Sequence, residues 1–524
     1  MDPELIEKLR DPAIYPEGAG AVEILQTHLS VVVLSGDRAY KFKKAIRLPF
    51  ADFTSLESRH RFCGEEVRLN RRLCPEIYEA VVDLCENSSG RLRIGEGGTV
   101  IDHAVRMKRL PQDRMMDGLL EHHKVGHEEI GKVARQMVAF HLAAERGPEV
   151  TAWGDPVKLR EFALANFSET EGCFPPPLHE ALERRTRDDF DQWLPVLQER
   201  AAGGCIVDGH GDLHARNICL LDSPVIYDCI EFNPAFRCGD VATEHAFLAM
   251  DLRFRGHPEL AEAYTDAVMA ASGDEAMGGL LPMLVRYRAM VRAKVSAIAA
   301  GEVEMGEAAR SEASDTARRY LRLAAATAVE EERPRWILCC GLPASGKSVL
   351  ASQLALSSGG AWPVFSSDRV RKELAGVAPT STLAPEWYEA GPSRRTYDEM
   401  LSRALSATRC SGGVVILDAN FRSRSERQRF REAARMVGAR VDLLHVELHE
   451  AIARERLRDR AASGDSVSDA GVEVYERLRP VFESPGEEEA DRVLSVHGES
   501  DAGEMVEEVL AALLERERSS GTKR

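Results

Sequence analysis

The sequence predicts two folds in succession, an α+β segment followed by an α/β segment with a parallel sheet. Short strand-like patterns open the first segment, and a long run of helix-like patterns follows them. From residue 335 onward the two kinds of pattern alternate, which is typical of a parallel sheet. At the start of this second segment, the stretch GLPASGKS at 341–348 lies between an apolar strand-like run and a helix-like run. A chain of 524 residues is also too long for a single core.

Composition narrows the class of protein. The net charge of −17 argues against nucleic acid or an anionic membrane as the main partner. The eleven cysteines include no C-x-x-C pair, which argues against a zinc site, and their odd number favours a reducing compartment. The chain has no signal-peptide pattern and no apolar run near the roughly 20 residues of a membrane span. We therefore expect a cytoplasmic protein without a membrane partner.

The first segment divides into a strand-rich part and a helical part. Apolar alternation and periodicity predict strands at 22–25, 28–34, 38–43, 81–84, 92–94 and 100–110, with one helix at 55–73. Helices are then expected at 127–145, 156–167, 177–201 and through much of 240–326, with a further short strand at 225–232.

One polar constellation in this segment has the spacing of a phosphotransferase site. His210-Gly211-Asp212 is followed by Asn217, and Asp228 lies in the next strand-like run. Phosphoryl transfer needs a base for the acceptor hydroxyl and oxygen ligands for a metal ion. We predict Asp212 as the base and Asn217 and Asp228 as metal ligands. A structural turn with buried polar groups, or a kinase fold that has lost catalysis, are the alternatives.

The stretch HGDLHARN, with Tyr227-Asp228 and Gly239-Asp240 after it, resembles the aminoglycoside phosphotransferase branch of the protein-kinase-like fold. The order of elements extends this resemblance over roughly residues 20–320. It implies a two-lobed, ATP-binding domain in which a strand lysine pairs with a helix glutamate. Lys41 and Glu66 are the residues it implies, with Lys43 and Glu65 as alternatives and a solvated charged surface as the other explanation.

Two departures from that family pattern are visible. No G-x-G-x-x-G loop precedes Lys41, and Asp228-Cys229-Ile230-Glu231 stands in place of D-F-G. Glu231 could therefore supply a further metal carboxylate. We expect His103 and His214 to be hydrogen-bonding residues rather than metal ligands.

The stretch at 341–348 matches the pattern G-x-x-x-x-G-K-[ST]. Its backbone N–H groups and the following helix N-terminus suit a phosphate, the lysine can reach the β- and γ-phosphates, and the last serine can hold Mg²⁺. An ordinary turn between strand and helix is the alternative. The predicted nucleotide contacts are Gly341, Ala344, Ser345, Gly346, Lys347 and Ser348, and Ser348 is also a predicted metal ligand.

The sequence after this loop contains further candidate residues for the same nucleotide site. Strands are expected at 336–340, 363–366, 413–417 and 441–447, with helices between them and a last helix at 502–516. Asp418 ends an apolar strand and is a predicted metal ligand. Asp368 is a candidate catalytic base, or else part of a helix cap. Arg456 and Arg460 lie about one helical turn apart and could clamp phosphates, or else form a solvated face.

Residues 335–500 resemble a group of small P-loop kinases related to gluconate and polynucleotide kinases. The stretches that carry this resemblance are GLPASGKS, SSDRVRKEL, VVILDANF, the Arg456–Arg460 pair and Ser468-Asp469-Ala470. The two halves together resemble bifunctional proteins that join an aminoglycoside phosphotransferase-like domain to an ATP-binding one.

These observations predict four parts: a kinase-like domain at 1–328, a linker at 329–334, a P-loop kinase domain at 335–512 and a polar tail at 513–524. The expected function is transfer of the γ-phosphate of ATP, with Mg²⁺, to hydroxyl groups of small molecules at two nucleotide sites. Two alternatives concern the P-loop domain, which could phosphorylate a polynucleotide 5′-hydroxyl or sense ATP without an acceptor. The nucleic-acid alternative depends on a basic cleft formed by Arg369, Arg371, Arg394 and Arg395.

Overall fold

The computed structural model describes residues 3–18, 20–48, 51–302, 306–331, 334–411, 413–463 and 469–515. These residues form two compact units. The first comprises 1–161, 192–255 and 260–284, and the second comprises 162–191, 256–259 and 285–524. Within the described ranges, no helix is long and apolar enough to cross a membrane.

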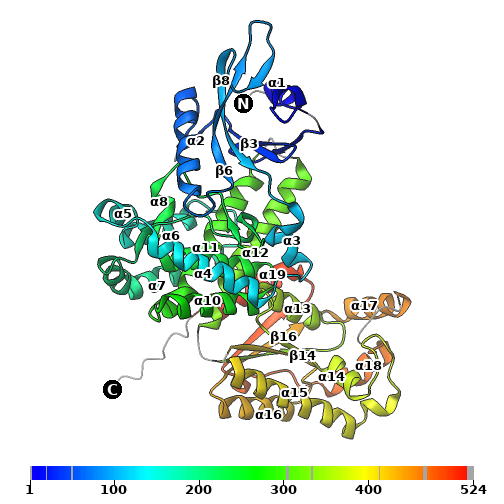
Figure 1. Ribbon diagram of the computed structural model, residues 1–524. Helices are drawn as coiled ribbons and strands as arrows, with labels where there is room; N and C mark the ends of the chain where they lie inside the picture. Colours follow the sequence, from blue (N-terminus) through cyan, green and yellow to red (C-terminus); the bar gives the residue numbers. More distant parts are fainter. Residues whose placement is uncertain are drawn as a thin grey trace. The chain divides into compact units, whose positions relative to one another are not determined.

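The first unit opens with a six-stranded antiparallel sheet in the order β1-β2-β3-β8-β6-β7. Its strands are β1 Glu23–Gln26, β2 Ser30–Ser35, β3 Arg38–Lys43, β6 Tyr78–Glu86, β7 Leu92–Ile94 and β8 Thr99–Lys108. Helix α2 (Leu56–Asn70) lies against this sheet (Figure 1). Because side chains alternate along a strand, Tyr40 and Phe42 enter one apolar core while Lys41 and Lys43 point to the face that α2 covers.

Helices and short strands follow the sheet in the first unit. They are α3 Met116–Glu121, α4 His127–Ala143, α5 Pro148–Trp153, β9 Ile206–Asp208, β10 Ile218–Cys219, β11 Val225–Ile226, α8 Pro234–Arg237, β12 Cys238–Asp240 and α9 Val241–Phe254. Helices α6 Pro156–Ser168, α7 Pro176–Ala202, α10 Pro258–Ser272 and α11 Met277–Ala300 have residues in both units. Strand β9 pairs with β12, and β10 pairs with β11, so two short antiparallel pairs frame the segment 209–217.

The strand predicted at 225–232 is wrong beyond Ile226. Strand β11 ends there, and Asp228 adopts a left-handed backbone with φ +68°. Extended β structure requires a negative φ, so the chain must turn at this residue.

The second unit contains a five-stranded, wholly parallel sheet in the order β14-β15-β13-β16-β17. Its strands are β13 Arg335–Cys340, β14 Val364–Ser366, β15 Val414–Asp418, β16 Arg440–Glu447 and β17 Arg492–His497. Its helices are α13 Lys347–Ser357, α14 Ser367–Leu374, α15 Ala390–Ser411, α16 Arg424–Met436, α17 Glu450–Ser463, α18 Val472–Leu478 and α19 Ala502–Leu514. Helices α13 and α19 cover one face of the sheet and α15 and α16 the other (Figure 1). The predicted fold class, a kinase-like α+β part followed by a P-loop domain with a parallel sheet, is confirmed.

Helix α12 (Glu307–Glu330) also belongs to the second unit, where it packs against α13 and α19. Glu507 of α19 is 2 % exposed and lies 2.9 Å from Arg318 Nη2 and 2.8 Å from Arg322 Nη2. Trp362 Nε1 donates to Glu330 Oε1 at 2.8 Å. The division at 329–334 stays a prediction, and residues 332–333 lie outside the described ranges. Of the predicted tail, 516–524 lie outside them too, whereas α19 continues to Leu514.

Candidate functional site

A buried cluster of charges joins strand β3 to helix α2 in the first unit. Lys41 Nζ lies 2.8 Å from Glu66 Oε1, and Lys43 Nζ lies 2.7 Å from Glu66 Oε2. Lys41 also forms an ion pair with Asp228, and Lys43 forms one with Glu231. Because side chains alternate along a strand, Lys41 and Lys43 lie on the same face of β3. The structure brings both of them to the same carboxylate, that of Glu66.

Glu65, the alternative helix partner, points elsewhere. Its Oε2 lies 2.8 Å from Arg68 Nη2, one turn further along the exposed side of α2. Glu66 instead is fully buried. Burial alone would raise the pKa of Glu66, but Lys41 and Lys43 outweigh it and lower that pKa to about 2. Glu66 is therefore an anion paired with both lysines.

The predicted base and one predicted metal ligand lie together in the segment between β9 and β10. Asn217 Nδ2 donates to the backbone oxygen of Asp212 at 2.9 Å and to its Oδ2 at 3.2 Å. The amide nitrogen is thus used to hold the base, and the amide oxygen is the atom suited to a cation. His214 Nε2 lies 3.2 Å from Asp212 Oδ2, whereas His103 Nδ1 is hydrogen-bonded to Asp83 Oδ1 at 2.8 Å in the sheet.

His210 ties this segment to the one that carries Asp228. Its Nδ1 accepts from the Asp212 N–H at 3.2 Å, so its Nε2 carries the proton and donates to the Tyr227 carbonyl at 2.9 Å. Burial lowers the pKa of His210, which suits this neutral form. Asp228 N–H donates to Tyr78 Oη at 3.3 Å, and the left-handed turn directs its carboxylate to Lys41. Strained backbone of this kind is common at functional sites.

Several residues that the sequence did not single out hold these segments in place. Asn70 of α2 accepts from the Cys229 N–H at 2.9 Å and donates to the Glu66 carbonyl at 2.9 Å. Asn70 is one helical turn after Glu66 on α2, and this spacing is the feature of the sequence that could have indicated its place beside the site.

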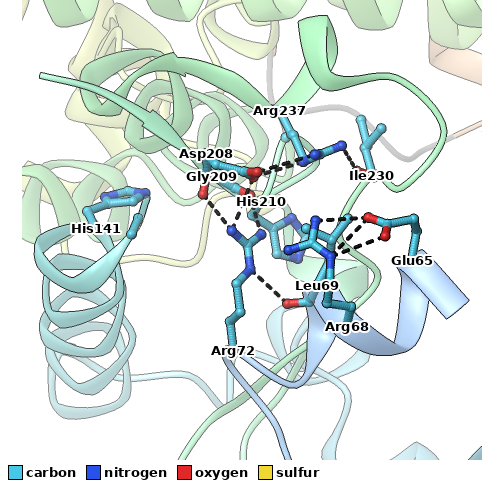
Figure 2. A network of polar contacts seen from close by, with 12 residues as sticks. Glu65, Arg68, Leu69, Arg72, His141, Asp208, Gly209, His210, Ile230 and Arg237 are labelled. Carbon is cyan, nitrogen blue, oxygen red and sulfur yellow. Dashed lines mark hydrogen bonds and ion pairs between the residues drawn. The ribbon is translucent and has the colours of Figure 1, made fainter. Parts of the chain in front are cut away.

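Arg72, two residues after the end of α2 and hydrogen-bonded to the Leu69 carbonyl, contacts the loop before Asp212 (Figure 2). Arg72 donates to the carbonyls of Asp208 and Gly209 at 2.7 Å each. Arg237 donates from Nε to Asp208 Oδ1 at 2.8 Å and from Nη1 to the Ile230 carbonyl at 3.4 Å (Figure 2). These bonds link α2, the 208–212 segment and the 228–231 segment, which together carry the candidate catalytic side chains.

Glu244 of α9 holds the His210-Gly211-Asp212 loop (the HGD loop) through its backbone N–H groups. Its Oε1 accepts from the N–H groups of His210 at 2.6 Å and Gly211 at 2.5 Å, and its Oε2 contacts His141 Nε2. Burial would raise the pKa of Glu244, but the hydrogen bond and charge of His141, with help from His210 and Gly211, lower it to about 2. The HGD loop is therefore anchored on a buried anion.

In the second unit, the GLPASGKS loop follows the central strand β13 and leads into α13. Two glycines permit close backbone packing around it. A Cβ at Gly341 would lie 2.6 Å from the Val446 carbonyl oxygen, and one at Gly498 would lie 2.0 Å from the Ser345 carbonyl oxygen. Gly346 and Ala344 adopt left-handed backbones with φ +100° and +67°. This is the arrangement in which successive N–H groups can converge on an anion.

Asp418 lies at the end of β15, beside this loop. In the sheet register it is opposite Cys339 of β13 on one side and Ser366 of β14 on the other. Burial raises the pKa of Asp418, and the charge of Lys347 and the hydroxyls of Ser348 and Ser366 only partly offset this. The structure therefore brings the predicted lysine, serine and aspartate of this site together.

Of the two predicted arginines on α17, Arg456 contacts the loop directly. Its Nη2 donates to the Gly498 carbonyl at 2.9 Å and its Nη1 to the Ala344 carbonyl at 3.5 Å. Arg460 lies one turn further along α17 and is partly buried. The helix thus supports the loop through Arg456.

Asp368 lies in the first turn of α14 and is half-buried. Arg371 Nη1 lies 3.0 Å from its Oδ1, and the Arg371 guanidinium stacks 4.9 Å from the centre of the Tyr388 ring. Arg371 is buried, whereas Arg369, Arg394 and Arg395 are exposed. The four arginines of the expected basic cleft therefore have different environments.

A further polar group, which the sequence suggested only through its Ser468-Asp469-Ala470 stretch, lies next to Arg371. Asp469 Oδ1 is 3.1 Å from Lys372 Nζ, and Oδ2 accepts from the Leu383 N–H at 3.1 Å and from Tyr388 Oη. Asp469 and Lys372 thus fasten the 379–388 segment to α14.

Both sites suit a nucleotide with Mg²⁺. The first offers a carboxylate, an amide oxygen and a lysine, which is the donor set that magnesium phosphates use. In the second, Ser345 Oγ and Asp418 Oδ1 are buried, and neither has a hydrogen-bond partner among the described residues. Buried polar atoms of this kind normally have a partner, so these two fit a bound polar group.

Taken together, the two units define a chain that joins a kinase-like fold to a P-loop domain. Residues 337–485 match the family model described as AAA domain. Uncharacterized proteins of Mycobacterium tuberculosis and Mycobacterium bovis are 30 % identical over 467 residues, which cover 87 % of this chain and 89 % of theirs. The chain belongs to the same family as these mycobacterial proteins.

Solved structures similar to each part were also found. Aminoglycoside 2′-phosphotransferase-IIIa in its GDP complex is 15 % identical, covers 61 % of this chain and 99 % of its own, and has a TM-score of 0.41. Shikimate kinase from Aquifex aeolicus is 19 % identical, covers 34 % of this chain and 95 % of its own, and has a TM-score of 0.23. The chain's own folds and the family match support nucleotide-dependent phosphotransfer.

The anchoring of the HGD loop on Glu244 predicts a pH effect on stability. The pKa of Glu244 is lower in the folded chain than its ordinary value of 4.5, so its stabilising effect is complete above that pH. This effect is lost as pH falls from about 4.5 toward 2, and by pH 3 the loss is on the order of 2 kcal/mol. Urea unfolding between about pH 6 and 3 should therefore show a steeper loss of stability in the unmodified chain than in Glu244→Gln. Parallel pH curves for the two proteins would contradict the assignment.

Proposed function

We propose that the chain is an ATP-dependent phosphotransferase with one nucleotide site in each unit, and that both use Mg²⁺ to phosphorylate hydroxyl groups of small molecules. The observation that carries this proposal is the convergence of Lys41, Glu66 and Asp228, since it matches the lysine, glutamate and metal-binding aspartate of kinase sites. In the second unit, the loop at 341–348 and the nearby Asp418 support the same chemistry.

In the first unit, Asp212 would accept the proton of the acceptor hydroxyl as its oxygen bonds to the γ-phosphorus and the bond to ADP breaks. Asn217 and Asp228 would hold Mg²⁺, which when bound neutralises charge on the phosphates. Lys41 would contact the phosphates, and the bond between Asn217 and Asp212 keeps the base beside the metal ligand.

In the second unit, Lys347 and the backbone of 341–346 would bind the phosphates, and Ser348 and Asp418 would hold Mg²⁺. Asp368 is the proposed base, and its ion pair with Arg371 fixes its carboxylate. The aminoglycoside phosphotransferase and shikimate kinase to which parts of the chain are similar are named for small acceptors, and this supports a small hydroxyl acceptor here.

A second candidate role for the P-loop domain is ATP sensing. Helix α13, which begins at Lys347, packs against α12, the last helix before residue 331. A nucleotide at the start of α13 would therefore act on a helix that continues the chain of the kinase-like part. The polynucleotide alternative is less favoured, because Arg371, one of the four arginines of its expected cleft, is buried and paired with Asp368.

The assignment of Asp212 predicts the outcome of one substitution. In a chain carrying Lys347→Ala to silence the second site, Asp212→Asn should lower acceptor-dependent ADP release by about 100-fold or more, because proton transfer contributes at least that much. Binding of an ATP analogue should persist. The acceptors to screen are sugars, aminocyclitols and nucleosides. Asp222→Asn, an exposed residue in the following loop, is the matched control. Full turnover by Asp212→Asn would show that another group is the base.

The sensing role predicts a different pattern. Phosphorylation by the first site should respond to Lys347→Ala, which removes the second nucleotide, but not to Asp368→Ala, which removes only the second base. Initial rates of the first site in these two variants decide between the roles. Equal first-site rates in Lys347→Ala and the unmodified chain would retire the sensing role and leave two independent enzymes.

A further inference from the structure

The two lysines of β3 contact the same glutamate but differ in their access to the site. The Lys41 side chain is 14 % exposed and contacts Asp228, whose side chain is 38 % exposed. The Lys43 side chain is only 2 % exposed. Of these two lysines, Lys41 is the more exposed, and it contacts the more exposed carboxylate.

Lys43 is enclosed by groups from three different segments. Its Nζ lies 2.7 Å from Glu66 Oε2 of α2, forms an ion pair with Glu231, and is 5.6 Å from the centre of the Phe53 ring. Glu231 is itself buried, and its carboxylate is engaged by the ion pair with Lys43. Lys43 could reach a phosphate only by giving up its contacts with Glu66 and Glu231.

We propose that Lys41 binds the nucleotide and that Lys43 is a positioning residue, which fixes Glu66 and the 228–231 segment without touching the nucleotide. The inference rests on the proposed function of the first unit and deepens it. It assigns separate roles to two lysines that sequence alone could not distinguish.

The geometry at Glu66 gives the physical reason. Each of its carboxylate oxygens contacts a different lysine, so the Lys43 contact remains when Lys41 turns toward a phosphate. If Lys43 were absent, Glu66 and Glu231 would be two buried carboxylates next to one lysine. Buried charges without a partner are costly, so Lys41 would be drawn to these carboxylates and away from the nucleotide.

Glu231 completes the arrangement because it belongs to the segment that carries Asp228. The pair between Lys43 and Glu231 ties this segment to the sheet, while Lys43 and Glu66 tie the sheet to α2. One side chain therefore aligns the predicted metal ligand, the helix glutamate and the nucleotide lysine.

The test uses the full chain with Lys347→Ala, so that only the first site binds nucleotide. Calorimetric titration with a non-hydrolysable ATP analogue and Mg²⁺ gives the dissociation constant, and thermal unfolding reports the fold. Lys43→Met should weaken binding by about tenfold or more, because it leaves Glu231 unpaired. Adding Glu231→Gln should recover most of that loss, because it removes the surplus charge. Lys43→Arg should bind like the parent, and Lys44→Met, one residue along, is the matched control.

The outcomes separate this inference from the proposed function. Tight binding by Lys43→Met, or weak binding that Glu231→Gln does not recover in a folded protein, would overturn the positioning role. If Lys43→Met does not fold, the double variant and Lys43→Arg carry the test, and weak binding by both would overturn it. A parent that binds no nucleotide would contradict the proposed function itself, and the inference with it.

Discussion

The first site depends on one fully buried carboxylate, that of Glu66. An anion removed from water is costly unless charges of opposite sign surround it closely, and this requirement fixes where its neighbours can be. Strand β3 must place Lys41 and Lys43 on the face that α2 covers, and α2 must present Glu66 to them. The alternation of a strand and the periodicity of a helix satisfy both conditions in short stretches of sequence.

A second buried carboxylate has the same effect on the loop that carries the candidate base. Glu244 accepts two backbone N–H groups of the HGD loop, so the position of that loop follows from α9. Arg72 and Arg237 then join the loop to α2 and to the 228–231 segment. The second site is built differently. The backbone conformation of 341–346 determines its shape, and Gly341 and Gly498 allow the close backbone contacts around it. Charge organises the first site, and main-chain geometry organises the second.

The sequence predicted the parts that depend on local periodicity. Strand β3 occupies the predicted 38–43, and the loop at 341–348 lies between the predicted strand and helix. The error at 225–232 has a local cause, since an apolar run cannot reveal the left-handed turn at Asp228. Strand β17 went unpredicted because its outer, partly exposed residues carry no continuous apolar pattern. Contacts such as Arg72 with Asp208 join residues far apart in the chain, so no spacing could show them.

The central claim of two nucleotide sites is tested most directly by the stoichiometry of binding. Calorimetric titration of the unmodified chain with a non-hydrolysable ATP analogue and Mg²⁺ should give two nucleotides per chain. Lys347→Ala and Lys41→Met should each leave one, and the double variant should leave none. One nucleotide per unmodified chain, or a stoichiometry that Lys347→Ala does not change, would contradict the account.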